Sequence, residues 1–287
     1  MTEVVAPPSI EQLELPGWRP ELIALDLDGT CVDGYLRLDP RIAAAVASAA
    51  KQLPVVVATG RMYRSALPWA RKLGVTAPLV CYQGALVQEL PDRNSAPGAV
   101  LSHIPLGALA TRRAIATARA HGWHRQGYFN DRLLCEEDRP ELDFYRDIAG
   151  VEITFVDDLA EAVRGGSTKL VCVITDEAGA MDCETVMRSS LGGLARVTRS
   201  QPQFVEITDP AATKSEALRR VCREFGVAME HCIAVGDAPN DIDMLAAVGF
   251  GVAVAGAKGS VLQVAAAVCQ GPQQGGVAAV LRAFGLA

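Results

Sequence analysis

Two acids follow directly on a short apolar run in the segment Asp26-Leu27-Asp28-Gly29-Thr30. Side chains alternate along a strand, so Asp26 and Asp28 are expected to point to the same side where that strand ends. Two carboxylates there repel each other unless they are solvated, cap a turn, or hold a divalent cation. Asp and Gly are ordinary turn residues, so this segment alone leaves both the turn and the metal site open.

A second group of polar residues, Thr59, Gly60 and Arg61, follows another apolar run. Thr59 could donate a hydrogen bond to a phosphoryl oxygen, or it could cap a helix that begins at Met62. Arg61 could bind phosphate, or it could pair with Asp33 or another acid. The residue types suit an anion site, but each of them has a structural alternative.

The segment Thr213-Lys214-Ser215-Glu216 fits a capping box, in which Thr213 covers a first-turn amide and Glu216 reaches back. This accounts for the two outer residues without any function. A lysine in the first helical turn opposes the helix dipole, which a nearby anion would offset. Lys214 is therefore either a solvated surface residue or the cation of an anionic site.

The last polar segment, Val235-Gly236-Asp237-Ala238-Pro239-Asn240-Asp241, again follows an apolar run. Pro239 and the acids suit the start of a helix. Asp237 and Asp241 also supply hard oxygen ligands of the kind that Mg²⁺ prefers. A helix start and a metal site both remain open for this segment alone.

The elements around these segments decide between the alternatives. Unalternated apolar runs predict strands buried on both faces of a parallel sheet, with helices between them. The predicted strands are Leu22 to Leu25, Val55 to Ala58, Leu79 to Tyr82, Cys232 to Val235, Gly251 to Val254 and Ala267 to Cys269. Helices are predicted to start at Asp39-Pro40, to end at Gly74, and to run onward from Ala211, Pro239, Lys258 and Gly276. All four polar segments thus lie at strand ends or helix starts, where doubly wound α/β folds bind their ligands.

The middle of the chain has a different pattern. Alternating residues predict a half-exposed strand at Val151 to Phe155 and a hairpin that turns at Asn130-Asp131, with a helix over Ala108 to His121. We therefore predict an inserted α/β domain with one covered face. The expected organisation is a flexible leader over residues 1–17, a doubly wound parallel core over 18–85 and 204–287, and an insert over 86–203.

Composition narrows the classes of function. The net charge of −6 argues against broad binding of nucleic acid or of an anionic membrane, which clustered Lys and Arg would favour. The nearly apolar runs fall short of the roughly 20 residues that span a bilayer, and the acidic start does not resemble a secretion signal. Eight scattered cysteines without a CxxC pair favour buried thiols. We expect a soluble cytoplasmic protein.

Taken in order, Asp-x-Asp-Gly-Thr, Thr-Gly-Arg, Lys and Gly-Asp-x-x-Asn-Asp resemble the four motifs of the haloacid dehalogenase superfamily of phosphatases. The insert between the second and third motifs resembles the second-class (C2) cap of its Cof-type branch, subclass IIB. The resemblance covers Glu21 to Leu286, and smaller matches lie at Gln203 to Ile207 and at Gly276-Val277.

Two short segments depart from the pattern of that branch. The chain has Gln83-Gly84-Ala85 where the branch usually has Asn-Gly-Ala, and Val254-Ala255-Gly256-Ala257 where it usually has Met-Gly-Asn-Ala. Both lie near where the family holds its substrate. The four motifs are intact, so the resemblance predicts the chemistry but not the substrate.

The resemblance implies a Mg²⁺-dependent phosphatase for a small phosphorylated metabolite, such as a sugar phosphate. Asp26 would attack phosphorus to give a phosphoaspartate, Asp28 would act as general acid and base, and Lys214 would neutralise charge. The groups that would hold the phosphoryl group are Thr59, Gly60, Arg61, Lys214 and Asn240. The metal ligands would be Asp26, Asp28 (by its backbone carbonyl), Asp237 and Asp241, the last directly or through water.

The inserted domain would act as a lid over this site. Trp123, His124, Arg125 and Tyr128 form a compact polar and aromatic group and are candidate substrate contacts, although such residues also occupy ordinary surface turns. Two other functions stay open. A phosphomutase would use the same nucleophile and metal, and a protein that binds a phosphorylated metabolite without turnover would keep the same residues.

Overall fold

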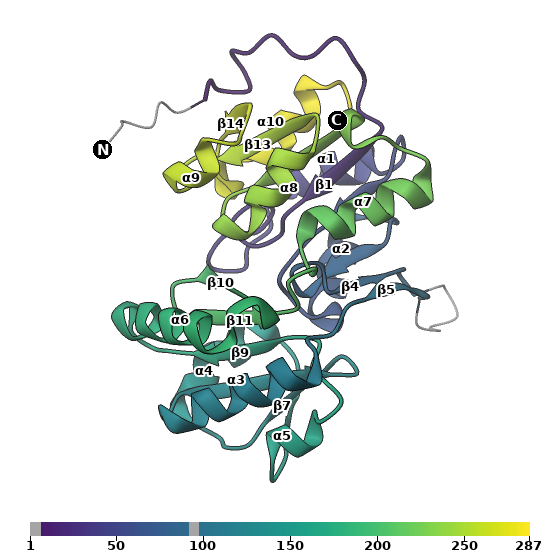
Figure 1. Ribbon diagram of the computed structural model, residues 1–287. Coiled ribbons are helices and arrows are strands. Elements are labelled where there is room, and N and C mark those ends of the chain that lie inside the picture. Colours follow the sequence, from purple (N-terminus) through teal and green to yellow (C-terminus); the bar gives the residue numbers. More distant parts are fainter. Residues whose placement is uncertain (1–6, 92–97) are drawn as a thin grey trace.

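The computed structural model describes residues 7–91 and 98–287, which form two lobes (Figure 1). The larger lobe, which we call the core, is built on a five-stranded sheet with the order β14-β13-β12-β1-β2, and every neighbouring pair in it is parallel. Its strands are β1 (Leu22–Leu25), β2 (Val55–Val57), β12 (Cys232–Gly236), β13 (Phe250–Val254) and β14 (Ala267–Cys269). These agree with five of the six predicted runs.

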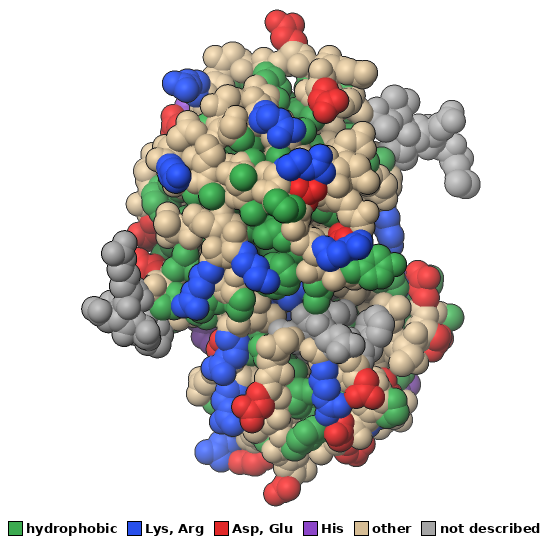
Figure 2. Space-filling view, turned by 180° about the vertical axis from the view of Figure 1, so that it is seen from behind, with side chains coloured by type: hydrophobic (Ala, Val, Ile, Leu, Met, Phe, Trp, Pro, Cys, Tyr) green, Lys and Arg blue, Asp and Glu red, His purple; other side chains and the backbone are tan. Residues whose placement is uncertain are grey.

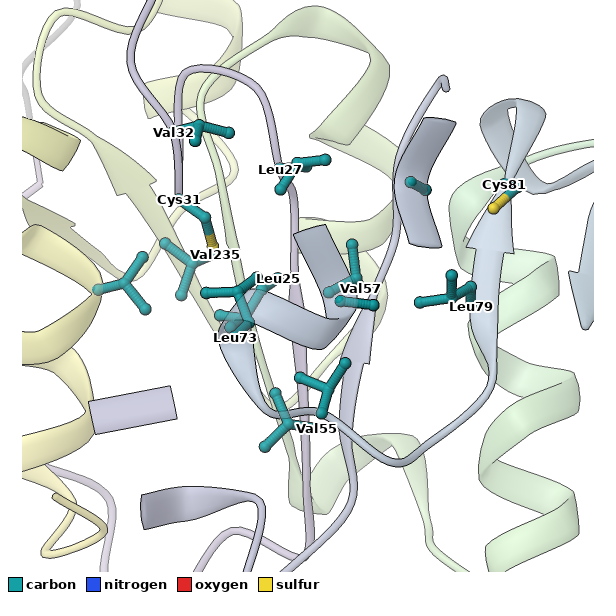
Figure 3. Packing of buried hydrophobic residues seen from close by; sticks show 14 of the residues in the cluster. Leu25, Leu27, Cys31, Val32, Val55, Val57, Leu73, Leu79, Cys81 and Val235 are labelled. Carbon is teal, nitrogen blue, oxygen red and sulfur yellow. The ribbon is translucent and has the colours of Figure 1, made fainter. Parts of the chain in front are cut away.

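Helices cover both faces of this sheet because its strands are apolar on both sides. Side chains of α1 (Pro40–Ala49), α2 (Tyr63–Leu73) and α10 (Gly276–Ala283) pack on one face. Those of α7 (Lys214–Phe225), α8 (Ile242–Ala247) and the short α9 (Gly259–Leu262) pack on the other. Figure 3 shows Leu25, Val57 and Val235 of neighbouring strands close together in the first of these layers. The predicted doubly wound fold is confirmed.

Local signals set the ends of the core helices. Asp39 caps α1 by accepting a hydrogen bond from the Arg41 amide, and Gly74 ends α2 in the left-handed conformation with φ of 69°. Thr213 caps α7 by accepting from the Glu216 amide at 3.1 Å. Thr59 caps no helix, because α2 begins only at Tyr63, and the capping alternative for Thr59 is wrong.

The sixth predicted run, β3 (Leu79–Cys81), belongs to a second, three-stranded sheet with β4 (Leu86–Gln88) and β5 (Val100–His103). A single bridge between Ala58 and Val80 joins β3 to the main sheet. Val87 and Leu101, from β4 and β5, pack with the residues under α7. These two strands lie in the range we assigned to the insert, yet they pack as part of the core.

The smaller lobe, which we call the cap, contains a six-stranded mixed sheet with the order β10-β11-β9-β6-β7-β8. Its strands are β6 (His124–Phe129), β7 (Arg132–Cys135), β8 (Ile153–Phe155), β9 (Leu170–Val173), β10 (Arg196–Gln201) and β11 (Phe204–Thr208). The strand β11 starts at the boundary that we placed at residue 204, but it pairs with β9 and β10 inside the cap. The chain therefore returns to the core after Thr208.

The two faces of the cap sheet are covered differently. Helices α3 (Ala108–Ala120), α5 (Leu159–Ala162) and α6 (Glu177–Leu191) pack on the outer face, away from the core. On the inner face, Leu142 of α4 (Pro140–Ala149) and residues of β9 and β11 share one apolar cluster with the core. Seen from behind, charges of both signs are interspersed over this lobe (Figure 2).

The predicted hairpin between β6 and β7 is confirmed. Asn130 and Asp131 form its turn with φ of 50° and 53°, as a two-residue turn requires. The side chain of Asp131 reaches the core, where it accepts hydrogen bonds from the amides of Tyr63 and Arg64, both at 3.0 Å, and from the Tyr82 hydroxyl at 2.7 Å. A residue of the cap thus caps the core helix α2.

Part of the segment that we predicted as a leader, residues 1–17, packs against the core. Ile10 is buried and donates its amide hydrogen to the carbonyl of Val268 at 2.8 Å, beside the edge strand β14. All eight cysteines are buried thiols, as predicted. Over residues 7–91 and 98–287, no helix has the length and apolar character to cross a membrane.

Candidate active site

Asp26 directly follows β1, which lies between β12 and β2 in the sheet, and is only 4% exposed. The ammonium group of Lys214, at the start of α7, donates to Asp26 Oδ1 at 2.5 Å and to Asp241 Oδ1 at 2.6 Å. The Lys214 side chain has no exposed surface. The solvated-lysine alternative is therefore wrong, and Lys214 links the first and last polar segments of the sequence.

Burial and neighbouring charges shift the pKa values of Asp26 and Lys214. Burial and the charge of Asp241 raise the pKa of Asp26 well above its usual value, although Lys214 acts in the opposite direction. Burial alone would lower the pKa of Lys214, but the charges of Asp241 and Asp26 outweigh it and raise that pKa. The lysine is thus a permanent cation beside the carboxylates.

Asp237 and Asp241 lie in the loop after β12. Asp241 Oδ2 accepts from the amides of Asp237 and Ala238, both at 3.1 Å, so Lys214 and the backbone engage both of its oxygens. Asp237 Oδ1 accepts from the Thr30 hydroxyl at 2.9 Å. Burial and the charge of Asp241 raise the pKa of Asp237 to about 6. This loop therefore presents Asp237 toward Asp26.

The donor set fits a divalent cation. Oxygens of Asp26, Asp237 and Asp241 lie within 4.8 Å of one another. These three carboxylates outnumber the one ammonium group between them, and hard oxygen ligands are what Mg²⁺ prefers. Gly29, with φ of 87°, lies so close to the Asp237 carboxylate that a Cβ there would collide with it. The chain thus packs tightly around this site.

Arg61 pairs with Asp28 and not with Asp33. Its Nε donates to Asp28 Oδ2 at 2.8 Å and its Nη2 donates to Asp28 Oδ1 at 2.6 Å, the two-pronged geometry of a strong ion pair. Asp33 instead accepts from Arg37 and Gln273, both at 2.8 Å. The acid that pairs with Arg61 is therefore one of the first motif, and phosphate binding by Arg61 stays a prediction.

Thr59 and Gly60 form a tight loop after β2. The Thr59 hydroxyl accepts from the Arg61 amide at 3.2 Å, and the Gly60 carbonyl accepts from the Lys169 ammonium group of the cap at 2.8 Å. A Cβ at residue 60 would collide with the side-chain amide of Gln83. A side chain at residue 60 would therefore displace the Gln83 amide.

A cavity of about 450 Å³ lies between the core and the cap. The core side of its lining contains Asp26, Asp28, Gly29, Asp33, Gly34, Leu36, Thr59, Gly60, Arg61, Asp237, Ala238 and Asn240, and the cap side contains Lys169, Gln201, Phe204 and Glu206. Lys214 and Asp241 lie behind this wall. A neighbouring cavity of about 320 Å³ shares Gly29, Gln201, Asp237 and Ala238 with it, so the two form one cleft.

Comparison with known families is decisive at this point, because the model of the haloacid dehalogenase-like hydrolases matches residues 23–281. The chain belongs to this family. The match spans the core, the cap and all four polar segments, as the sequence motifs predicted.

Individual relatives of this haloacid dehalogenase-like hydrolase match it over most of its length. A 5-amino-6-(5-phospho-D-ribitylamino)uracil phosphatase from Bacillus subtilis is 26% identical, over 93% of this chain and 98% of its own. A phosphoglycolate phosphatase from Archaeoglobus fulgidus is 26% identical, over 94% and 99%. The solved structure of a subclass IIB sugar phosphatase superposes with a TM-score of 0.80 at 20% identity, over 93% and 100%, and shows the same fold. The chain is a phosphatase of this family.

The candidate substrate contacts on the cap are not where the sequence suggested. Arg125 lies opposite Cys172 in the cap sheet, and its side chain is on the outer face. There it forms an ion pair with Glu136. His124 is buried beside it, and Trp123 packs with the outer apolar cluster. None of these three residues is part of the cavity lining. Strand alternation turns Arg125 away from the core.

Like His124, which pairs with Val173 of the inner apolar cluster, Tyr128 lies on the inner face of the cap sheet. It is fully buried and packs edge-to-face on Tyr82 of the core, with ring centroids 5.4 Å apart, so it is an interface residue and does not line the cavity. The cap residues that do line the cavity include Lys169 and Glu206, which the sequence analysis missed. A charged residue inside or beside an apolar run was the available signal, since such a residue is buried with its strand.

Proposed function

We propose that the protein is a Mg²⁺-dependent phosphomonoester hydrolase in which Asp26 attacks the phosphorus atom of a small phosphorylated metabolite. The observation that carries the proposal is the buried Lys214, held between Asp26 and Asp241 behind the wall of a cavity that also contains Asp28 and Asp237. A nucleophilic carboxylate beside a fixed cation and a cluster of metal-ligating oxygens suits phosphoryl transfer.

In the first half-reaction Asp26 would form a bond to phosphorus as the bond to the leaving oxygen breaks, giving a phosphoaspartate. Lys214 would stabilise the negative charge that collects on the transferring group, because it is charged and fixed in place. A bound Mg²⁺ would be held by Asp26, Asp237 and the backbone carbonyl of Asp28, and would neutralise phosphoryl charge. Both oxygens of Asp241 are engaged, which supports a role in fixing Lys214 and the loop, with any metal contact through water.

Asp28 would be the general acid and base. It would give a proton to the leaving oxygen and then take one from the water that hydrolyses the phosphoaspartate. In the structure Arg61 donates hydrogen bonds to both oxygens of Asp28. This arrangement suits the ionised carboxylate that would accept a proton. To donate one, Asp28 would have to turn from Arg61 toward the substrate.

Two further groups of the core would hold the phosphoryl group, and Asn240 would orient the substrate beside it. Thr59 and the Gly60 amide lie at the cavity wall, next to the reacting carboxylates. Asn240 is buried at 7% exposure, and its Oδ1 has no hydrogen-bond partner among the described residues. A buried acceptor of this kind is costly unless a ligand satisfies it, which supports a role for Asn240 in orienting the substrate.

The test is a screen of the purified protein with Mg²⁺ against phosphorylated sugars, polyols, nucleotides and cofactors, with inorganic phosphate as the readout. We expect hydrolysis that requires Mg²⁺ and is lost in Asp26→Asn, while the exposed control Glu216→Gln keeps it. Full activity in Asp26→Asn would refute the mechanism. The phosphomutase alternative predicts isomer formation in place of phosphate release, and the alternative without turnover predicts neither.

A further inference from the structure

A buried ion pair of the cap, which the mechanism above does not use, lies against the loop of Thr59 and Gly60. Lys169 immediately precedes β9 and Glu206 lies in the neighbouring β11. Their side chains are 2% and 5% exposed, and Lys169 Nζ lies 2.8 Å from Glu206 Oε1. Burial of two charges is unfavourable unless each is well hydrogen-bonded, so the remaining partners of this pair matter.

Those partners come from the core. Lys169 Nζ also donates to the carbonyl oxygen of Gly60 at 2.8 Å, and Glu206 Oε2 accepts from Gln83 Nε2 at 2.6 Å. Gln83 Oε1 in turn accepts from Asn240 Nδ2 at 3.0 Å. A continuous run of hydrogen bonds therefore leads from the second motif into the cap and back to the fourth motif.

The backbone at Gln83 has an unusual conformation. Tyr82 and Gln83 have φ of 53° and 61°, so two consecutive residues other than glycine adopt the left-handed region. The Gln83 amide donates to the carbonyl of Thr59 at 3.1 Å. Strain of this kind persists only where its surroundings enforce it, and it gathers at functional sites. Here it brings the Gln83 side chain between Asn240 and Glu206.

Both ends of the run lie next to groups that the mechanism uses. The Gly60 carbonyl belongs to the same peptide unit as the Arg61 amide, which donates to the Thr59 hydroxyl, so fixing one fixes the other. At the far end, Asn240 directly precedes Asp241, which holds Lys214. A shift of about 1 Å in such groups can lower a rate a hundredfold.

We propose that Lys169, Glu206 and Gln83 are positioning residues, which form a bridge through which the cap fixes the Gly60 peptide and the Asn240 amide relative to Asp26. The proposal rests on the phosphatase function proposed above. The cap then contributes to the rate of the chemical step as well as to the choice of substrate.

The first test compares Lys169→Met with Arg125→Met, using para-nitrophenyl phosphate and Mg²⁺. Arg125 is a matched control because it also pairs with a largely buried carboxylate, Glu136, but within the cap. For Lys169→Met we expect kcat to fall about ten- to hundredfold with little change in the Mg²⁺ concentration for half-maximal activity. For Arg125→Met kcat should stay within about twofold. Equal losses in the two variants would overturn the proposal.

The second test separates positioning from stability. Lys169→Met leaves the Glu206 charge unpaired and should lower Tm, whereas Lys169→Met/Glu206→Gln removes both charges and should recover much of it. The kcat of this double variant should stay low, because the bond to Gly60 is still missing. Gln83→Asn, one methylene shorter, should also lower kcat. Recovery of kcat together with Tm would show a purely structural role and overturn the proposal.

A third measurement does not depend on activity. Hydrogen exchange of residues 59–62, with Mg²⁺ present, should be faster in Lys169→Met than in the wild type, and unchanged in Arg125→Met. If the wild-type protein hydrolyses no phosphoester, the phosphatase function fails while this comparison still decides whether the bridge exists. Unchanged exchange in Lys169→Met would overturn the bridge.

Discussion

The two sides of the cleft satisfy their charges in different ways. On the core side, Asp26, Asp241 and Lys214 are paired with one another at the end of one sheet and need nothing from the cap. On the cap side, Lys169 and Glu206 complete their hydrogen bonding only by reaching Gly60 and Gln83 of the core. The core alone thus brings Asp26, Asp241 and Lys214 together, whereas the loops next to them depend on contact between the core and the cap.

Because of this difference, we expect the largest loss of activity from a substitution on the core side. Lys214→Met removes a fixed cation from two buried carboxylates, and we expect kcat to fall by about a hundred- to a thousandfold or more. Breaking a buried ion pair costs about 3–5 kcal/mol, so unfolding should also come at lower denaturant concentration. The exposed Lys51→Met, which lies outside the cleft, is the control, with wild-type activity expected. A Lys214→Met variant that kept more than a tenth of the wild-type kcat would contradict this assignment.

A second core substitution should act on the metal. Asp237→Asn keeps the size of the side chain but removes a charge from the oxygen cluster, so we expect the Mg²⁺ concentration for half-maximal activity to rise about ten- to a hundredfold. Titration of activity with Mg²⁺ measures it. Lys169→Met should leave that concentration nearly unchanged, and a similar rise in both variants would erase the contrast between the two sides.

The pH dependence of metal binding offers a smaller effect. Because the pKa of Asp237 is raised to about 6, this carboxyl is mostly protonated at pH 5 and mostly ionised at pH 8. Mg²⁺ must displace the proton at the lower pH, so the rise in Tm on adding Mg²⁺ should be larger at pH 8 than at pH 5. Calorimetric scans at both values, with and without Mg²⁺, test this. An equal rise at both would speak against Asp237 as a ligand.

The smallest effect is expected on the outer surface of the cap. Arg164 and Glu161 form an ion pair whose side chains are 78% and 67% exposed. Such pairs contribute about 0–1 kcal/mol, so Arg164→Ala should leave kcat unchanged and lower stability slightly at most. Denaturant unfolding and a phosphate-release assay check it. A loss of activity comparable to that of Lys169→Met would show that the inner face of the cap is not special.

Much of the core could be predicted from sequence because its signals are local. Apolar runs fixed strands such as Leu22–Leu25, and Asp39, Gly74 and Thr213 set helix ends that the structure confirms. The motif residues meet because the carboxyl ends of parallel strands share one edge of the sheet. Proximity of Asp26, Asp237 and Asp241 is a consequence of that topology.

The rest depends on contacts between distant segments. Nothing local to Arg61 distinguishes Asp28 from Asp33 as its partner, since that choice is made by the path of the loop after β1. On the cap, the sequence of β6 does not indicate which of its faces looks toward the core, so it cannot select the residues that line the cavity. A charge inside or beside an apolar strand indicates that Lys169 and Glu206 are buried, but their pairing with each other follows only from the pairing of β9 with β11.

The hairpin turn of the cap has a consequence for how substrate enters. Asp131 covers the first amides of α2, the helix that follows the loop of Thr59 and Gly60, so lifting the cap on that side would leave this helix uncapped. Loss of a helix cap costs about 0.5–2 kcal/mol, equivalent to roughly a two- to thirtyfold preference for the shut arrangement from this contact alone. This contact favours the closed arrangement of the two lobes, so opening of the cap to admit substrate would have to break the hydrogen bonds of Asp131.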